Sequence, residues 1–276
     1  MSNEQRGAQR GAAALGIGLA VLIAAAVFGT MMARGRWWFP PLASAQGRSI
    51  DALFLATFVI IAAAFVLVQG LLAWFVWRYR DRGQRASYWH DHRALELIYT
   101  IIPAVVMTGL TLAAAGLWSR VHSAPPAGAM IVEVRAEQFG WKARYPGPDG
   151  RFGRVDPGQY HPRRNPLALD RADPAGRDDL VVDASSRELH LVVNRPVEIR
   201  LSAKDVVHSF FVPAFRLKQD AVPGITTSIW FTPTRTGRFE IACAELCGVG
   251  HYAMRGRIVV ETPEEYADWL AEQSTP

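Results

Sequence analysis

Long apolar runs occur only in the first half of this chain of 276 residues. Three such runs, each with few charges, cover about residues 12–32, 53–76 and 95–117. Each run has about 20 residues or more, which is enough for a helix to cross a hydrocarbon core of roughly 30 Å. The pattern predicts a membrane anchor over residues 1–122 with three transmembrane helices.

The first apolar run has an alternative interpretation as a secretory signal peptide. Ala43-Ser44-Ala45 follows it and resembles a small-residue cleavage site. The run is longer than the usual core of a signal peptide and is well separated from that site, which favours a retained helix. Cleavage stays open as the alternative.

The arginines predict the orientation in the membrane. Five of them lie at the loop between the second and third runs: Arg78, Arg80, Arg82, Arg85 and Arg93. Because loops rich in Lys and Arg stay in the cytoplasm, everything after the third run is expected on the periplasmic side. We therefore expect a multi-pass protein of the inner or plasma membrane with an extracytoplasmic C-terminal domain.

The formal net charge of +5 belongs to the membrane part of the chain. From Arg120 onward, basic and acidic residues occur in equal numbers. A nucleic-acid-binding domain would carry a basic surface, so this distribution argues against a nucleic-acid partner.

The hydrophobic pattern changes to alternation after residue 122. Alternating segments predict strands at 131–135, 189–193, 197–201, 227–231 and 239–242. Many short strands without intervening helices are typical of a Greek-key sandwich or barrel. The pattern predicts one all-β domain over residues 123–276.

Two segments of this domain depart from the alternating pattern. Residues 146–183 are rich in Gly, Pro, Asp and Arg, which predicts a long surface insertion between strands. Residues 263–272 predict a short final helix, with Thr262 as its N-cap and Glu265 completing a capping box.

Four groups suited to a soft metal ion lie within residues 243–254. They are the thiols of Cys243 and Cys247, the imidazole of His251 and the thioether of Met254, and His208 is a further candidate upstream. Sulfur and imidazole ligands together favour copper, and a weak Met ligand is typical of electron-transfer copper sites. One cysteine would suffice for a mononuclear site; with two, each thiolate can bridge a pair of ions that carry one histidine each.

Other interpretations of these residues are less specific. A Cys-x-x-x-Cys pair in an extracytoplasmic domain is often a disulfide. A zinc site could use two cysteines and two histidines, but zinc seldom binds Met and the spacing differs from common zinc motifs. The five groups taken together favour copper.

Three segments, 205–215, 218–224 and 243–254, closely resemble subunit II of cytochrome c oxidases. The resemblance implies a cupredoxin domain with a dinuclear copper centre, CuA, above the catalytic subunit I. It implies a magnesium ion at the interface with subunit I, bound by the side chain of Glu245. It also implies six copper ligands, with Glu245 contributing its backbone carbonyl: His208, Cys243, Glu245, Cys247, His251 and Met254.

Two further segments resemble functional parts of that family. Residues 96–104 resemble the start of its second anchoring helix, where an acidic residue, here Glu96, lies at the mouth of a proton path; a solvated carboxylate at a helix start is the alternative. Residues 137–141 resemble a Gln-Trp-x-Trp segment whose first Trp accepts electrons from cytochrome c. Phe139 replaces that Trp here, and Trp141 is either a second candidate for electron acceptance or a core residue.

The resemblance implies the function of one component of cytochrome-c oxidase. Cytochrome c would reduce the copper pair, which would pass electrons to haem in subunit I, where oxygen becomes water. The chain lacks Cys-x-x-Cys-His, so no covalently bound c-type haem is expected in it. The first apolar run departs from the family, which usually has two anchoring helices.

Three other functions fit the sequence less well. A membrane-tethered copper-delivery protein would need exchangeable ligands, often rich in Met or His. A quinol oxidase subunit would have lost copper ligands, and none is lost here. Nitrous oxide reductase uses the same centre, but it has a catalytic domain and no such membrane anchor.

Overall fold

The computed structural model describes residues 3–33, 38–80, 85, 87–186 and 188–273. The chain forms two compact units. The helical unit contains Met1–Trp38 and Asp51–Ala115, and the β unit contains Phe39–Ile50 and Gly116–Pro276.

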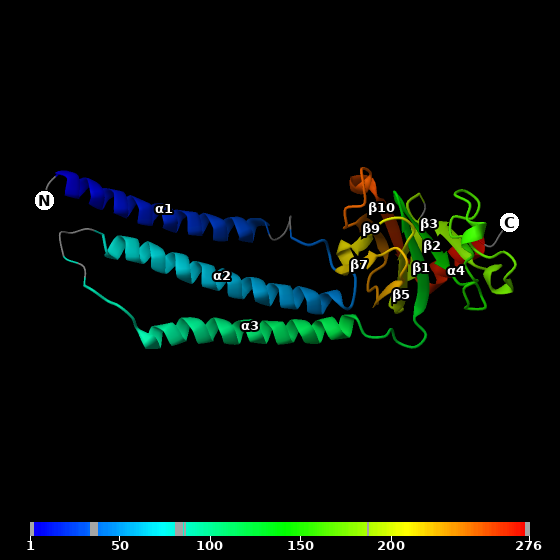
Figure 1. The fold of residues 1–276 in the computed structure, drawn as a ribbon, viewed down its shortest axis with the longest axis horizontal. Helices are drawn as coiled ribbons and strands as arrows, with labels where there is room; N and C mark the ends of the chain where they lie inside the picture. Colours follow the sequence, from blue (N-terminus) through cyan, green and yellow to red (C-terminus); the bar gives the residue numbers. More distant parts are fainter. Residues whose placement is uncertain (1–2, 34–37, 81–84, 86, 187, 274–276) are drawn as a thin grey trace. The chain divides into compact units, whose positions relative to one another are not determined.

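The predicted apolar runs form three helices, α1 (Asn3–Ala33), α2 (Gly47–Arg78) and α3 (Arg93–Val121) (Figure 1). Helices α2 and α3 are long and apolar enough to span a membrane, whereas the apolar part of α1, Ala14–Thr30, is shorter. Most of their large apolar side chains are exposed, as expected for helices that face lipid. Two membrane-spanning helices are therefore supported, and the third span stays a prediction. Arg82, part of the predicted cytoplasmic loop, lies outside the described residues.

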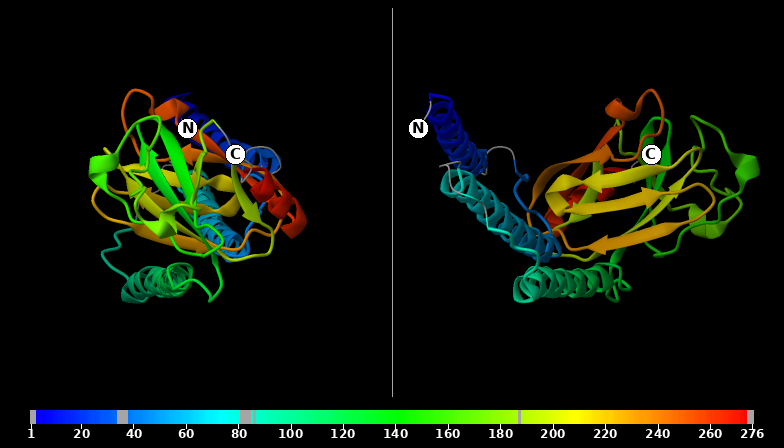
Figure 2. Two further views of the ribbon diagram at one scale, coloured as in Figure 1. Left: turned by 90° about the vertical axis from the view of Figure 1, so that its right-hand side faces the viewer. Right: turned by 60° about the vertical axis from the view of Figure 1, so that its left-hand side comes forward.

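The strands of the β unit form two five-stranded sheets, which can be followed as two layers in Figure 2. The first sheet has the order β3-β2-β1-β5-β8 and the second has the order β4-β10-β9-β6-β7. Parallel pairing of β1 with β5 and of β4 with β10 joins strands that are distant in sequence. The predicted all-β sandwich is confirmed. The strands are β1 (Met130–Glu137), β2 (Gly140–Tyr145), β3 (Leu180–Asp183), β4 (Glu188–Val192), β5 (Val197–Ala203), β6 (His208–Val212), β7 (Leu217–Ala221), β8 (Thr227–Phe231), β9 (Gly237–Cys243) and β10 (Arg255–Glu261).

The core of the sandwich follows from the alternation of side chains along the strands. In β1, Met130, Val132, Val134 and Ala136 are buried, while the residues between them are half-buried on the other face. A shift of one residue in register would turn this apolar set outward, so burial fixes the pairing.

The final helix, α4 (Pro263–Gln273), begins with the predicted capping box. The N–H of Thr262 donates to Glu265 Oε2 at 2.9 Å, and the N–H of Glu265 donates to Thr262 Oγ1 at 3.3 Å. The two side chains therefore satisfy two backbone donors at the start of the helix.

The predicted insertion is irregular up to its last four residues, which form β3 at the edge of the first sheet. It contains two short 3-10 helices, η1 (Pro157–Gln159) and η2 (Pro174–Gly176). Buried Asn165 holds it together: its side-chain nitrogen donates to Gln159 O at 3.0 Å and Leu169 O at 2.9 Å, and its side-chain oxygen accepts from Leu169 N at 2.9 Å.

A segment between α1 and α2 belongs to the β unit, which the sequence did not indicate. Ala43 and Ser44 are buried there. The N–H of Ala43 donates to Ala214 O at 2.9 Å, and Ser44 Oγ donates to Phe215 O at 2.6 Å. The small residues that resemble a cleavage site therefore have a packing role, and cleavage there would remove these interactions.

Candidate metal centre

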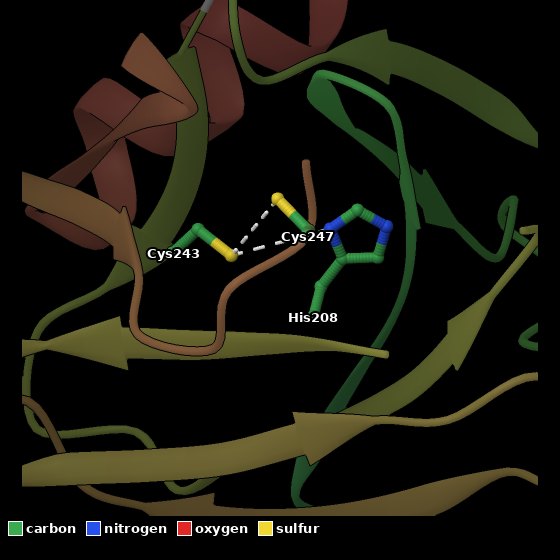
Figure 3. A group of neighbouring side chains, drawn as sticks. All are labelled: His208, Cys243 and Cys247. Carbon is green, nitrogen blue, oxygen red and sulfur yellow. Dashed lines mark hydrogen bonds between the residues drawn. The ribbon is translucent and has the colours of Figure 1, made fainter. Parts of the chain in front are cut away.

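The candidate ligands are brought together by β6, β9 and the loop that follows β9. Cys243 is the last residue of β9 and His208 is the first of β6, and the two strands pair antiparallel. The loop returns so that the N–H of Cys243 donates to Met254 O at 3.1 Å. Strand pairing thus brings the side chains of His208, Cys243 and Cys247 close together (Figure 3).

The two thiols lie side by side without a bond between them. Cys243 Sγ and Cys247 Sγ are 3.8 Å apart, and both cysteines are free. An S–S bond is about 2.05 Å long, so the disulfide interpretation does not describe this structure. The ligand atoms of His208, Cys243 and Cys247 all lie within 4.8 Å of one another.

An imidazole nitrogen flanks each sulfur. His208 Nδ1 lies 4.0 Å from Cys243 Sγ, and His251 Nδ1 lies 3.6 Å from Cys247 Sγ. Metal bonds of about 2.0–2.3 Å to nitrogen and sulfur place the ligand atoms of one ion at such separations. The arrangement offers one imidazole on either side of a pair of sulfurs.

Two weaker donors complete the set. Met254 Sδ lies 3.7 Å from Cys247 Sγ, and its side chain is buried. The carbonyl oxygen of Glu245 lies 3.2 Å from Cys243 Sγ, while residue Glu245 is exposed. The structure therefore gathers all six groups that the resemblance implied, and their sulfur and nitrogen atoms fit copper.

Burial disfavours the thiolate form of Cys247. Burial, together with the neighbouring Cys243, raises the pKa of Cys247 to about 11. A bound metal ion reverses this preference, because its charge stabilises the thiolate. The donor set is thus suited to a resident metal.

Asp205 holds His208 from the side opposite the sulfurs. Its Oδ1 lies 2.8 Å from His208 Nε2, which leaves Nδ1 directed at the thiols. Such a carboxylate fixes the tautomer and the orientation of a ligating imidazole. Burial raises the pKa of Asp205, but hydrogen bonds from His208, Gln138 and Val206 outweigh it and hold the pKa below the ordinary value.

Gln138 joins this arrangement to the ligand loop. Its backbone N–H donates to Asp205 Oδ2 at 2.8 Å, and its side-chain nitrogen donates to Cys247 O at 2.6 Å. The sequence did not reveal the roles of Asp205 and Gln138, although an acidic residue three positions before a candidate ligand is a signal that could have indicated the first.

The two aromatic candidates for electron acceptance differ in exposure. The side chain of Phe139 is 39% exposed and lies against the ligand loop, whereas Trp141 is fully buried. A Cβ atom at Gly250 would lie 2.5 Å from the Phe139 ring, so this close approach requires glycine. The Trp141 ring packs edge-on against His208, with ring centroids 6.3 Å apart. Only Phe139 of the two reaches the surface.

Exposed apolar side chains on the ligand loop and beside it form an apolar rim. Leu246, Val249 and Tyr252 are strongly exposed next to the ligands, and together with Phe139 they form this rim. Exposed apolar residues that lie close together commonly mark a partner surface. The sequence did not indicate this rim, because exposed and buried residues do not alternate at a regular spacing within the loop.

Glu96 lies in the first turn of α3, exposed, in the helical unit. The structure therefore keeps it at a helix start, as the sequence indicated, where a carboxylate also interacts favourably with the helix dipole.

The fold and the site define a class: a membrane-anchored β-sandwich protein with a soft-donor metal centre. The family model "Cytochrome C oxidase subunit II, periplasmic domain" matches residues 171–262, and the corresponding transmembrane-domain model matches residues 31–117. The chain belongs to the cytochrome c oxidase subunit II family.

Two relatives of known name agree with this assignment. The "Alternative cytochrome c oxidase subunit 2" of Bradyrhizobium diazoefficiens is 38% identical over 240 residues, covering 87% of this chain and 85% of that protein. "Cytochrome c oxidase subunit 2" of Cereibacter sphaeroides is 32% identical over 242 residues, covering 85% and 79%. The solved periplasmic domain of subunit II (CoxB) of Bradyrhizobium japonicum aligns at 29% identity with a TM-score of 0.39, over 54% of this chain and 95% of that one.

These findings confirm several predictions. The chain is a subunit of cytochrome-c oxidase, a membrane protein with an extracytoplasmic C-terminal domain of cupredoxin-like fold. Other oxidase subunits are therefore its partners.

Proposed function

We propose that this chain receives electrons from cytochrome c at a dinuclear copper centre, CuA, and passes them to haem in subunit I for the reduction of oxygen to water. The observation that carries the proposal is the convergence of two unbonded thiols with an imidazole beside each of them. The protein would reside in the plasma membrane, with this centre on the periplasmic side.

The proposed roles of the ligands follow from their positions. Cys243 and Cys247 would bridge the two ions, and His208 and His251 would each complete one side. Buried Met254 and the carbonyl of Glu245 would be weak outer ligands. When bound, the copper pair supplies one-electron redox chemistry; the protein supplies fixed ligand positions and excludes water.

Electrons would enter at the apolar rim, where Phe139 contacts the ligand loop. Trp141 is buried and cannot touch a docked donor, so we assign it to the core beside His208. An apolar rim lets two proteins approach closely around a redox centre without trapping charged groups.

Two acidic residues complete the proposal. The backbone carbonyl of Glu245 is directed at Cys243, while the residue is exposed. The side chain of Glu245 would therefore bind magnesium at the interface with subunit I, separately from the copper ions. Glu96, at the start of α3, would serve the mouth of a proton path in subunit I.

Burial of three of the six proposed ligands favours electron transfer over copper delivery. Cys247, Met254 and His208 are buried, whereas a delivery protein needs ligands that a recipient can reach. Fixed, buried ligands are instead suited to a metal centre whose geometry changes little during redox cycling.

A kinetic experiment on the purified oxidase tests this function. Reduced cytochrome c is mixed with the oxidised enzyme without oxygen, and the oxidation of cytochrome c and the copper signal are followed together. We expect copper reduction to coincide with cytochrome c oxidation and to precede haem reduction. Haem reduction that precedes copper reduction would contradict the proposal.

Truncation of the rim tests where electrons enter. Phe139→Ala should slow the step that depends on cytochrome c concentration, whereas Val155→Ala, an exposed apolar truncation in the insertion, should not. Equal rates in the two variants would exclude Phe139 from this role.

A further inference from the structure

The insertion forms a large cavity on the β unit that none of the candidate metal ligands lines. The cavity has a volume of about 870 Å³ and lies between the irregular part of the insertion and strands β2 and β3. Its wall includes four arginines, Arg163, Arg164, Arg171 and Arg177. This volume lies within the range of small-molecule sites, about 300–1,000 Å³.

Several carboxylates of the insertion accept hydrogen bonds from other residues of the insertion. Asp170 Oδ2 accepts from Arg154 Nη2 at 3.1 Å, and Asp173 Oδ2 accepts from the N–H of Arg154 at 2.8 Å. Asp156 accepts from the N–H of Gly158 at 2.9 Å and caps η1. Hydrogen bonds from backbone N–H groups lower the pKa values of Asp170 and Asp173, which keeps both groups ionised.

The acidic residues in the cavity wall are also paired. Asp179 Oδ2 lies 3.2 Å from Arg144 Nη1 and 2.9 Å from the N–H of Gly153, and its side chain is buried. Asp183 Oδ2 lies 2.6 Å from Lys142 Nζ. Neither carboxylate is therefore left to neutralise the four arginines.

The four arginines are exposed and have no carboxylate at ion-pair distance within the described part of the chain. The only side-chain hydrogen bond found for them there is from Arg171 Nη2 to Arg164 O, at 3.0 Å. The insertion thus separates its charges: carboxylates are used internally, while guanidinium groups are left at the cavity.

We propose that this cavity binds a small multivalent phosphate compound. Guanidinium groups offer pairs of N–H donors whose geometry matches phosphate oxygens, and several of them around one cavity fit a ligand with several charges. A concave site of this size fits a small molecule better than the face of a protein, which would need a broader and flatter contact area.

Calorimetric titration of the purified oxidase tests the proposal. Inorganic tripolyphosphate and ATP are titrated separately at near-physiological ionic strength, where weak surface attraction is screened. Equal affinities would identify the phosphate chain as the ligand, and tighter binding of ATP would show that the cavity also holds the nucleoside. Absence of saturable binding for both compounds would overturn the proposal.

A matched pair of double variants separates the cavity from overall charge. Replacing Arg163 and Arg177 by Gln should weaken binding about 100-fold, or about tenfold for each guanidinium group removed. The control replaces Arg151 and Arg195 by Gln, exposed arginines that do not line the cavity, and should leave affinity unchanged. Unchanged copper content in both variants shows that the β unit is folded.

The same variants distinguish a small ligand from a protein partner. Equal phosphate affinity in the two double variants would overturn the proposal. So would a cavity variant that alters only the interaction with cytochrome c, because the arginines would then form a protein docking surface.

Discussion

The ligand loop, 243–254, and the part of the insertion before β3, 146–179, are both irregular, but their polar groups are satisfied in different ways. In the insertion, Asn165 and the carboxylates bond to neighbouring backbone and to Arg154. In the ligand loop, the strongest donors to a metal converge on one another and have few partners of their own.

This difference indicates what each region needs in order to be ordered. The insertion supplies its own hydrogen bonds and needs no added group. The ligand loop brings thiols and imidazoles together in an arrangement that a shared cation would stabilise, because metal binding and local folding are coupled. A substitution in one region should therefore leave the order of the other region unchanged.

The largest effect is expected from Cys247→Ser, which removes one proposed bridge. Copper content should fall and oxygen consumption with cytochrome c should drop more than about 100-fold, beyond the loss typical for residues that only support a ligand. Val155→Ser, an exposed change in the insertion and outside the apolar rim, is the control. Full activity in Cys247→Ser would exclude the bridging role.

A smaller effect is expected from Asp205→Asn, which weakens the support of His208. Copper affinity should fall about 10–100-fold, because the imidazole loses the carboxylate that fixes its orientation. Competition with a copper chelator measures this, and Asp268→Asn, a change at an exposed residue of α4, is the control. Affinity equal to that of the control would show that Asp205 does not position His208.

Asn165→Ala should affect the insertion alone. The substitution removes three hydrogen bonds of a buried side chain, so local opening should become easier by about 1–3 kcal/mol. Hydrogen exchange of residues 153–176 measures the change, while the copper signal should stay the same. A loss of copper in this variant would contradict the separation of the two regions.

Acid should lower the local stability of the insertion. Hydrogen bonds from backbone N–H groups lower the pKa values of Asp170 and Asp173, so their stabilisation is present above the ordinary pKa of about 4. It is lost as the pH falls through the lowered folded pKa values. Exchange in residues 153–176, corrected for intrinsic rates, should accelerate only below about pH 4. Replacement of both residues by Asn should remove this pH dependence; its persistence would assign the effect to other groups.

The sequence predicted those parts of the fold in which local chemistry repeats or is unambiguous. Alternation located β1 and β5, and the capping box located the start of α4. Strands β2 and β6 were missed because their burial does not alternate, since both faces are largely covered. Packing of residues 39–50 on the β unit depends on interactions between distant segments, which no local pattern records.

The residues of the site divide in the same way, into those that local sequence indicates and those that depend on contacts between distant segments. Cys243, Cys247, His251 and Met254 were found because soft ligands lie close together in sequence. The roles of Asp205 and Gln138 depend on strand pairing and loop closure, so they became visible only in three dimensions. The basic cavity likewise required knowing which charges of the insertion are already paired.

The most direct test of the dinuclear copper centre is copper quantification together with electron paramagnetic resonance of the purified, oxidised oxidase. The account predicts two copper ions bound to this chain and a hyperfine pattern produced by one electron shared equally between two copper nuclei. A single copper ion with the pattern of one nucleus, or no copper with Cys243 and Cys247 joined in a disulfide, would contradict it.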